Sequence, residues 1–199
     1  MDITDIFTRE RASLAPLAGI TDSAYRRICK EYGASPVMTE MVSSDGYIRG
    51  HGSDKTLRFL RFHPSERPIG FQFFGSDADM IAEAAQRSLE FGPDFIDINA
   101  GCPMKKVVTR GAGSALLLDP HNLGRIVRKV SEAAFPVPVT VKMRSGWDSE
   151  NINAVETASI CAQNGARAII VHPRPRSQLF GGTSDWNVIK AVKEAIDAP

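Results

Sequence analysis

Long apolar runs are absent from this sequence of 199 residues. No segment approaches the ~20 consecutive apolar residues that a helix needs to span a bilayer. Residues 1–10 alternate polar and apolar side chains, and they lack the basic start and apolar stretch of a secretory signal. We therefore expect a cytoplasmic protein with no membrane association.

Cysteine is scarce and charge is balanced. The three cysteines, Cys29, Cys102 and Cys161, are an odd number and widely spaced, so they form neither a metal-binding pair nor a disulfide framework. This favours a reducing compartment and predicts no metal site. The formal net charge of +1, from 24 basic and 23 acidic residues, does not by itself indicate a nucleic-acid partner. Such a role would depend on local clusters of basic residues.

Short apolar segments alternate with amphipathic helical segments. Several are apolar nearly throughout, as is typical of parallel strands covered on both faces. Repeated βα units predict an α/β fold with right-handed crossovers, either an open doubly wound sheet or a closed barrel. No Gly-x-Gly-x-x-Gly motif follows the first candidate strand, which disfavours a dinucleotide-binding sheet and leads us to prefer the barrel. The predicted strands are Leu14 to Leu17, Pro36 to Glu40, Ile69 to Phe73, Phe95 to Asn99, Val139 to Met143 and Ala168 to Val171.

The helical segments carry start and stop signals. Thr21 or Asp22 is a candidate amino-terminal cap for the first helix, and Gly33 is a candidate stop. Asp119 followed by Pro120 predicts the start of a later helix. The first helix is expected to bury one apolar face, made of Tyr25, Ile28, Cys29 and Tyr32.

The repeat stops after six units. A (β/α)8 barrel usually takes about 250 residues, so we expect residues 1–199 to form one TIM-type barrel domain truncated after about six βα units. The open edges of such a sheet would expose unpaired backbone groups. The alternative is therefore a shorter protein that is completed by a partner.

Polar and basic groups recur where the predicted strands end. Catalytic groups of parallel barrels gather at the carboxyl ends of the strands, whereas a purely structural sequence would place turn residues there. The pattern therefore predicts a functional site at this end of the sheet. The candidates are Pro16 to Gly19, Glu40, Gln72, Asn99 with Cys102, Lys142 with Arg144, and His172 with Arg174 and Arg176.

Each candidate has a structural and a functional interpretation. Cys102 lies in a loop after the fourth strand, where it either packs against the barrel mouth or takes part in catalysis. Cys29 and Cys161 fall in helical segments, as small buried residues often do. Lys142 is costly to bury unpaired, which favours a cation that stabilises negative charge on a bound cofactor. His172, beside it on the neighbouring strand, becomes a candidate ligand contact.

Two amide side chains and two basic loops complete the set of candidate site residues. Gln72 and Asn99 could each read the edge of a flavin or base, or only satisfy backbone groups. Basic residues follow the fourth strand (Lys105, Lys106 and Arg110) and the sixth strand (Arg174 and Arg176). Charge runs are usually solvated faces, and we adopt that interpretation for Lys105. Two basic loops around one pocket would nevertheless suit a polyanionic substrate such as RNA.

Seven segments, in a fixed order along the chain, carry a resemblance to a known family. They are Ala15–Asp22, Gly70–Gln72, Asp97–Pro103, Lys106–Val107, Gly111–Leu117, Val141–Arg144 and Val171–Arg176. Any one of them is weak, but the ordered series at strand ends is specific. By these residues the chain resembles the tRNA-dihydrouridine synthases of the bacterial type along nearly its whole length.

The resemblance implies a TIM-barrel enzyme that contains FMN and reduces the C5–C6 double bond of uridines in tRNA, with NADPH or NADH as reductant of the flavin. It implies hydride transfer from reduced FMN to C6 and a proton from Cys102 to C5. That role needs a protonated thiol, without a strongly lowered pKa. The implied flavin contacts are Pro16, Leu17, Ala18, Gln72, Lys142 and His172. The implied substrate contacts are Asn99, Lys106, Arg144, Arg174 and Arg176.

Other readings stay open beside this resemblance. The family's last barrel strands, whose loops hold the flavin phosphate, and its carboxy-terminal helical tRNA-binding domain have no counterpart in these residues. A second hypothesis is a flavin oxidoreductase that acts on a free pyrimidine or a dihydroorotate-like substrate. A third is a non-catalytic barrel fragment that binds RNA or a partner without flavin. The basic loops favour RNA, and the set of Gln72, Cys102, Lys142 and His172 favours an enzyme.

Overall fold

The computed structural model describes residues 3–7, 12–50 and 54–199. Its strands are β1 (Val37–Met38), β2 (Val42–Ser43), β3 (Ile69–Phe74), β4 (Phe95–Ala100), β5 (Val139–Arg144) and β6 (Ala166–His172). Its α-helices are α1 (Ile3–Ile6), α2 (Ser23–Glu31), α3 (Ser44–Arg49), α4 (Asp54–Leu57), α5 (Ala78–Ser88), α6 (Lys105–Val108), α7 (Pro120–Ala134), α8 (Ala154–Gln163) and α9 (Trp186–Ala195). Short 3-10 turns cover Pro64–Glu66, Leu89–Phe91, Gly113–Leu118 and Arg176–Gln178.

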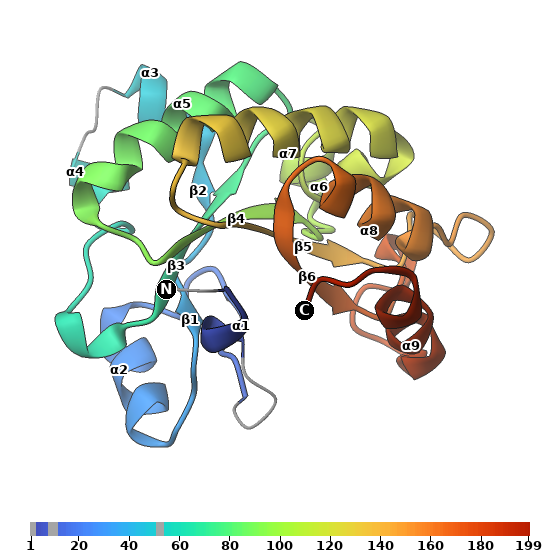
Figure 1. Cartoon of the computed structure of the whole chain (residues 1–199), viewed down its shortest axis with the longest axis horizontal. Coiled ribbons are helices and arrows are strands. Elements are labelled where there is room, and N and C mark those ends of the chain that lie inside the picture. The colour runs from blue at the N-terminus through green and yellow to red at the C-terminus, as the bar shows by residue number, and fades with distance from the viewer. Residues whose placement is uncertain (1–2, 8–11, 51–53) are drawn as a thin grey trace.

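The described strands form one six-stranded parallel sheet. Its order is β1-β3-β4-β5-β6, and β2 pairs with β3 beyond the end of β1. The strands follow one another around the sheet in chain order, with helices between them on one side (Figure 1). This is the arrangement of an open part of a (β/α) barrel, which confirms the predicted fold class.

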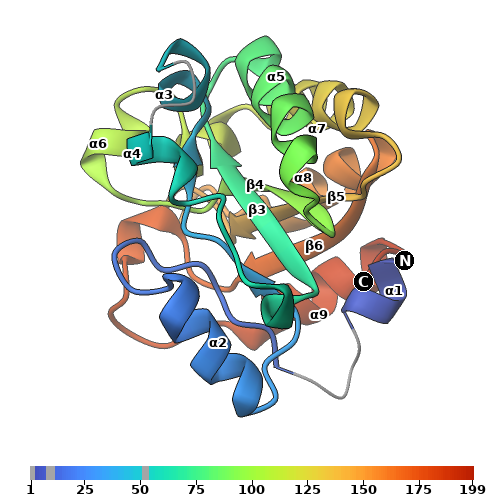
Figure 2. The same cartoon turned by 90° about the vertical axis from the view of Figure 1, so that its left-hand side faces the viewer.

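The main core lies between the sheet and the helices on its outer face. Helix α7 packs against both α5 and α8, and α8 packs against α9. Figure 2 shows α5 and α7 together on one side of β3 and β4, with α2 well away from them. The predicted cap of α7 is confirmed, because the Asp119 side chain accepts a hydrogen bond from the Asn122 backbone N–H. The inward stripe of this helix, Leu123, Ile126, Val127 and Val130, is fully buried.

A second, smaller core closes the amino-terminal end of the strands. Ile3 and Ile6 of α1 are buried against Met38 of β1, Phe95 of β4 and Ala168 of β6. Phe95, the first residue of β4, therefore lies under this short helix. The carboxyl ends, which carry the predicted site, lie at the other end of the sheet.

Two predicted strands differ from those in the structure. Of residues 36–40, only Val37–Met38 form a strand, β1, and the next strand, β2, begins beyond this range at Val42. Of the predicted strand Leu14 to Leu17, the structure shows a single bridge from Leu14 to Val37. Pro16 explains the short pairing, since a proline has no backbone N–H to continue a ladder.

The predicted buried face of the first helix is wrong. Helix α2 begins after the Asp22 cap as predicted, but Tyr25 and Ile28 are exposed, and Tyr32 is 90% exposed. The residue that α2 buries is Arg26. The helix therefore contacts the rest of the protein through a polar anchor, and its apolar stripe faces outward.

Candidate active site

One face of the sheet carries polar side chains in successive rows. Gln72 is the register partner of Asp97, and Asp97 is that of Thr140. One step further along, Asn99 pairs with Lys142. The last row pairs Arg144 with His172. Because side chains alternate along a strand, residues two apart share a face, and partners on parallel strands project to the same side. The three rows therefore form one polar surface that ends at the carboxyl edge of the sheet.

A continuous chain of hydrogen bonds runs through the first two rows. Thr140 Oγ1 and Gln72 Nε2 donate to the two carboxylate oxygens of Asp97, at 2.5 and 2.7 Å. Asn99 Nδ2 donates to Gln72 Oε1 at 2.8 Å. Asn99 Oδ1 then accepts from the backbone N–H groups of Gly101 and Cys102, at 3.1 and 2.9 Å. The interior of the sheet is thereby connected to the loop that carries the predicted catalytic thiol.

Burial sets the charge behaviour of this interior. Complete burial raises the pKa of Asp97 to about 7, while hydrogen bonds from Thr140 and Gln72 and the charge of Lys142 act in the opposite direction. Burial also lowers the pKa of Lys142, which Asp97 raises and Arg144 lowers. Among the residues that the structure describes, no hydrogen bond or ion pair is formed by the Lys142 ammonium.

The backbone of Cys102 forms three hydrogen bonds. Its N–H is bound by Asn99, and its carbonyl oxygen accepts from the hydroxyl and the N–H of Ser114, at 2.6 and 3.0 Å. Gly113 has a φ of 61°, and a Cβ there would lie 2.7 Å from the Cys102 carbonyl oxygen. Burial raises the pKa of the thiol, against a backbone hydrogen bond from Met104 and the positive charge of Arg144. The thiol therefore stays protonated at neutral pH.

His172 lies in a cationic environment at the end of β6. Burial, followed by the charges of Arg144, Lys142 and Arg174, lowers the pKa of its imidazole to about 4. Its ring lies 6.4 Å from that of Phe180, and Arg174 Nη1 lies 3.3 Å from Nε2. At neutral pH the side chain is therefore an uncharged hydrogen-bonding group.

Arg144 connects two loops of the site. It is only 1% exposed, and its guanidinium donates to the carbonyl oxygens of Gly101, Pro175 and Leu179, at 3.0, 3.1 and 2.8 Å. It also lies over the exposed ring of Phe180, 5.3 Å from its centre. These contacts join the loop after β4 to the loop after β6. The predicted substrate contact of Arg144 stays a prediction, and three of its hydrogen bonds are already made within the protein.

The other predicted basic residues are less enclosed. Lys106 is exposed on α6. Arg174 is half-buried and donates to the carbonyl oxygens of Gly181 and Gly182. Arg176 lies over the indole of Trp147 at 4.3 Å, and its Nε is buried without a hydrogen-bond partner among the described residues. These three side chains flank the polar surface from the loops after β4 and β6.

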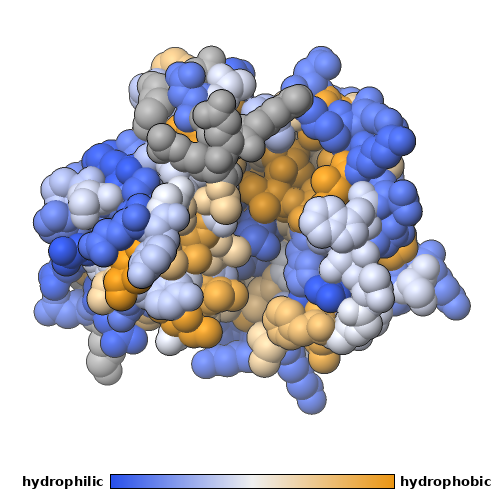
Figure 3. Space-filling view, turned by 90° about the horizontal axis from the view of Figure 1, so that it is seen from below, coloured by the Kyte–Doolittle hydropathy of each residue, from blue (hydrophilic) through white to orange (hydrophobic). Residues whose placement is uncertain are grey.

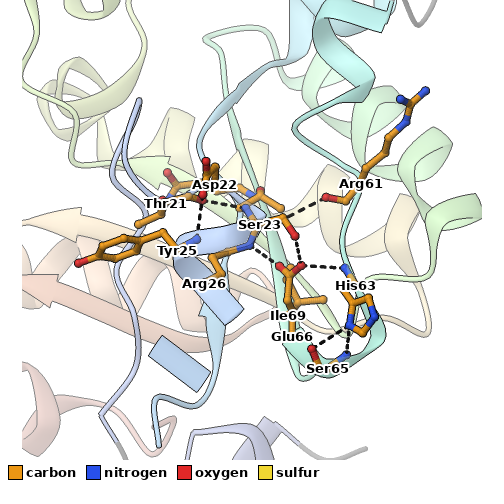
Figure 4. A network of polar contacts seen from close by, with 12 residues as sticks. Thr21, Asp22, Ser23, Tyr25, Arg26, Arg61, His63, Ser65, Glu66 and Ile69 are labelled. Atoms are coloured by element: carbon orange, nitrogen blue, oxygen red, sulfur yellow. Dashed lines mark hydrogen bonds and ion pairs between the residues drawn. The ribbon is translucent and has the colours of Figure 1, made fainter. Parts of the chain in front are cut away.

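The predicted flavin loop, Pro16 to Ala18, is held by α2. The Leu17 N–H donates to Thr21 Oγ1 at 2.9 Å, and the Thr21 carbonyl oxygen accepts from Arg26 at 2.8 Å. Arg26 forms a buried ion pair of 2.6 Å with Glu66, which also accepts from the His63 N–H (Figure 4). This network fixes the start of α2 and, through it, the loop.

Ala18 of this loop lines a cavity that also borders Met41, a neighbour of Asn99. Ala18, Glu40 and Met41 line a cavity of about 660 Å³, and Met41 Sδ lies 3.6 Å from Asn99 Nδ2. Seen from below the view of Figure 1, the molecule is hollowed, with apolar side chains on the walls of the hollow (Figure 3). The structure thus brings the predicted residues of strands β3 to β6 onto one face, with the loop beside them.

The donor set fits a flavin. Lys142 offers an ammonium without a partner among the described residues, His172 is neutral, and both lie at the open end of the polar surface. An anionic or electron-rich ring edge is the group that such donors accept. A metal fits less well, because the described residues contain no group of three His, Cys, Asp or Glu side chains that could hold an ion.

Asp97, Thr140 and Ser114 were not among the predicted site residues. Asp97 had a signal, because a carboxylate within the otherwise apolar run Phe95–Ile98 must be paired or neutral once buried. Thr140 and Ser114 had no such signal in the sequence, since threonine and serine are common in strands and turns. Their importance depends on partners more than ten residues away in sequence.

The fold and this surface define a class of protein: an open parallel α/β barrel with a polar site at the carboxyl ends of its strands. The profile of the dihydrouridine synthase family, Dus, matches residues 13–199. The chain therefore belongs to the dihydrouridine synthase family.

Curated relatives agree with this assignment. The chain is 43% identical over 189 residues to tRNA-dihydrouridine synthase B of Pseudomonas aeruginosa, covering 95% of this chain and 56% of the relative. It is 44% identical over 191 residues to the protein of the same name from Pasteurella multocida, covering 96% and 57%. The chain thus spans little more than half the length of these relatives.

Solved structures support the fold alone. A putative lyase/mutase from Burkholderia cenocepacia aligns with a TM-score of 0.60 at 16% identity, covering 99% of this chain and 69% of that one. A variant of NCR from Zymomonas mobilis aligns with a TM-score of 0.56, also at 16% identity, covering 97% and 70%. Among the described residues, no helix is long and apolar enough to cross a membrane.

Proposed function

We propose that the protein reduces uridine to 5,6-dihydrouridine in tRNA, in the cytoplasm, with FMN as its resident cofactor and NADPH or NADH as the reductant of the flavin. The observation that supports this proposal is the register of Asn99 with Lys142 and of Arg144 with His172, beside a Cys102 loop whose N–H is bound by Asn99, in a chain of the dihydrouridine synthase family.

The cofactor would be held by residues from several strand ends. Lys142, His172 and Gln72 would contact the ring and ribityl chain, and the loop Pro16, Leu17, Ala18 would line the ring from the other side. The chemistry that reduced flavin would supply there is a hydride for C6 of the uracil. The unpaired ammonium of Lys142 supports this placement, because a buried cation is stabilised by an anionic partner.

Cys102 would deliver the proton to C5. Addition of hydride to C6 leaves an enolate, and the S–H bond of the thiol then breaks as the new C–H bond forms at C5. A general acid must be protonated before the reaction begins. The raised pKa of the Cys102 thiol supports this role, since burial keeps the group in its S–H form. The thiolate that remains regains a proton from solvent before the next turnover.

The substrate would be held from the rim. Asn99 would face the uracil, and Arg144, Lys106, Arg174 and Arg176 would lie toward the tRNA or its phosphates. Cations that flank a pocket suit a polyanion. A uridine in folded tRNA has to leave its stack to enter such a pocket, and the backbone must be held meanwhile.

The test is an assay of the protein with unmodified tRNA and NADPH, with dihydrouridine measured by mass spectrometry of the nucleosides. Absorbance near ~450 nm in the purified protein reports bound oxidised flavin. Dihydrouridine formation in tRNA, with no reduction of free uracil, supports the proposal. Reduction of free uracil or oxidation of dihydroorotate without activity on tRNA would replace it with a free-pyrimidine oxidoreductase. Absence of both flavin and activity would favour a non-catalytic barrel.

A further inference from the structure

The hydrogen-bond chain between Asp97 and Cys102 has only one consistent orientation. At one end, the backbone N–H groups of Gly101 and Cys102 can only donate, so Asn99 must turn its oxygen toward them. The Asn99 amide nitrogen then faces Gln72, which must present its own oxygen. The Gln72 amide nitrogen is left facing Asp97, which must accept.

Asp97 is therefore the group that ends the chain. Its Oδ2 accepts the Gln72 N–H that this orientation leaves facing it, while Oδ1 is bound to Thr140. The carboxyl group is completely buried, with 0% exposure, and lies two residues before Asn99 on β4.

We propose that Asp97 is a positioning residue for Cys102, acting through the two amide side chains between them. Asp97 orients the amide of Gln72, and Gln72 orients the amide of Asn99. Asn99 in turn binds the N–H groups of the loop and so positions the thiol. The inference deepens the proposed function: the catalytic use of this placement rests on the proposed role of Cys102 as the acid. The placement itself is a property of the protein that is measurable without flavin or tRNA.

An alternative role for Asp97 is to neutralise Lys142. The two roles are separable by substitution, because asparagine keeps an acceptor but has no charge. In Asp97→Asn the side-chain oxygen can accept from Gln72 while the new NH2 group donates to Thr140 Oγ1. The chain then keeps its orientation. Asp97→Leu removes the acceptor and the charge together.

The experiment measures alkylation of Cys102 by iodoacetamide as a function of pH, with modified peptides resolved by mass spectrometry. In Asp97→Leu we expect the apparent pKa of Cys102 to fall toward that of a free thiol and its alkylation at neutral pH to rise about fivefold, because the loop loses an anchor and admits water. Asp97→Asn is expected to match the wild type. Gln72→Met breaks the same hydrogen-bond chain without removing a charge, so it should raise the alkylation of Cys102 in the same way. It replaces Asp97→Leu in the test if that variant does not fold.

Val130→Ala is the matched control. It weakens the core from α7 without touching the hydrogen-bond chain, so its Cys102 profile should remain that of the wild type even at a comparably lowered melting temperature. Wild-type alkylation in folded Gln72→Met would overturn the inference, and so would an Asp97→Asn profile like that of Asp97→Leu.

The same variants separate this inference from the proposed function. If Cys102→Ala retains full activity on tRNA, the acid role fails, while an altered alkylation profile in Gln72→Met still supports the placement by Asp97. If Cys102→Ala is inactive and the alkylation profiles are unchanged, the acid role stands and the positioning role fails.

Discussion

Asn99 on β4 and Lys142 on β5 are register partners, so both side chains project from the same face of the sheet. The neutral amide cannot balance the charge of the ammonium, and Asp97 is the carboxylate that raises the Lys142 pKa. Burial of the same Asp97 raises its own pKa to about 7, so near neutral pH it is ionised in only part of the molecules. Lys142 is thereby left as a cation that is compensated only in part, beside the proposed place of the flavin.

Replacing this cation should weaken flavin binding. In Lys142→Met we expect the affinity for FMN to fall about tenfold or more, because a buried charge-assisted contact contributes roughly 1.5–3 kcal/mol. Quenching of flavin fluorescence on titration with the protein measures the affinity. Lys105→Met is the matched control, since Lys105 is exposed on α6. Equal affinities for the two variants would contradict the assignment of Lys142.

His172 should titrate well below the usual range of histidine. Its folded pKa of about 4 lies below the ordinary histidine pKa of 6.5, so the folded state binds fewer protons than the unfolded state between these values. Its contribution to stability is therefore present above about pH 6.5 and is lost as pH falls through about 4. Imidazole NMR signals, with His172→Gln for assignment, report the titration directly. A midpoint near 6.5 would show that the imidazole is not desolvated.

The strands that carry the site could be predicted from sequence. Strands β3 to β6 are apolar runs interrupted by a few polar residues, and burial on both faces makes such runs easy to identify. The polar residues at their ends fall on one face because strand alternation is a local property. Gln72, Asn99, Lys142 and His172 were therefore within reach of a sequence-based prediction.

Long-range polar partners could not be predicted in this way. Arg26 looks like a solvated residue of an amphipathic helix, and its burial depends on Glu66, 40 residues later. Arg144 looks like a substrate contact, whereas its guanidinium is bound by carbonyl oxygens of two distant loops. The exposure of the apolar residues of α2 could not be predicted for the same reason, because the ion pair of Arg26 determines which face of the helix is buried.

Asp97 should make stability depend on pH. Its folded pKa of about 7 lies above the ordinary aspartate pKa of 3.8, so the folded state binds more protons than the unfolded state between these values. The contribution of its protonated form is complete below about pH 3.8 and is lost as pH rises through about 7. The free energy of unfolding of the wild type, relative to Asp97→Asn, should therefore fall between about pH 4 and pH 7 in urea titrations. A constant difference would contradict the raised pKa.

The ion pair between Arg26 and Glu66 should be important for stability. Both side chains are buried, at 3% and 0% exposure, so Glu66→Ala leaves an unpaired charge in the interior and should cost about 3–5 kcal/mol. Urea denaturation measures this cost. The control is Asp45→Ala, which breaks an exposed pair with Arg49 and should cost less than about 1 kcal/mol. Similar costs for both variants would mean that water reaches the inner pair.

Cys102→Ala should abolish most of the reaction while leaving the cofactor site intact. The backbone of residue 102 is held by Asn99 and Ser114 through main-chain groups, so removal of the sulfur should not move the loop. We expect flavin occupancy and reduction by NADPH to be retained, and transfer to tRNA to slow by about 10²–10⁴-fold, the usual contribution of a general acid. Single-turnover oxidation of the reduced flavin by unmodified tRNA isolates that step. Ser114→Ala loosens the Cys102 carbonyl oxygen but keeps the thiol, so its loss should be smaller. A rate of tRNA reduction in Cys102→Ala equal to that of the wild type would mean that the proton comes from another group.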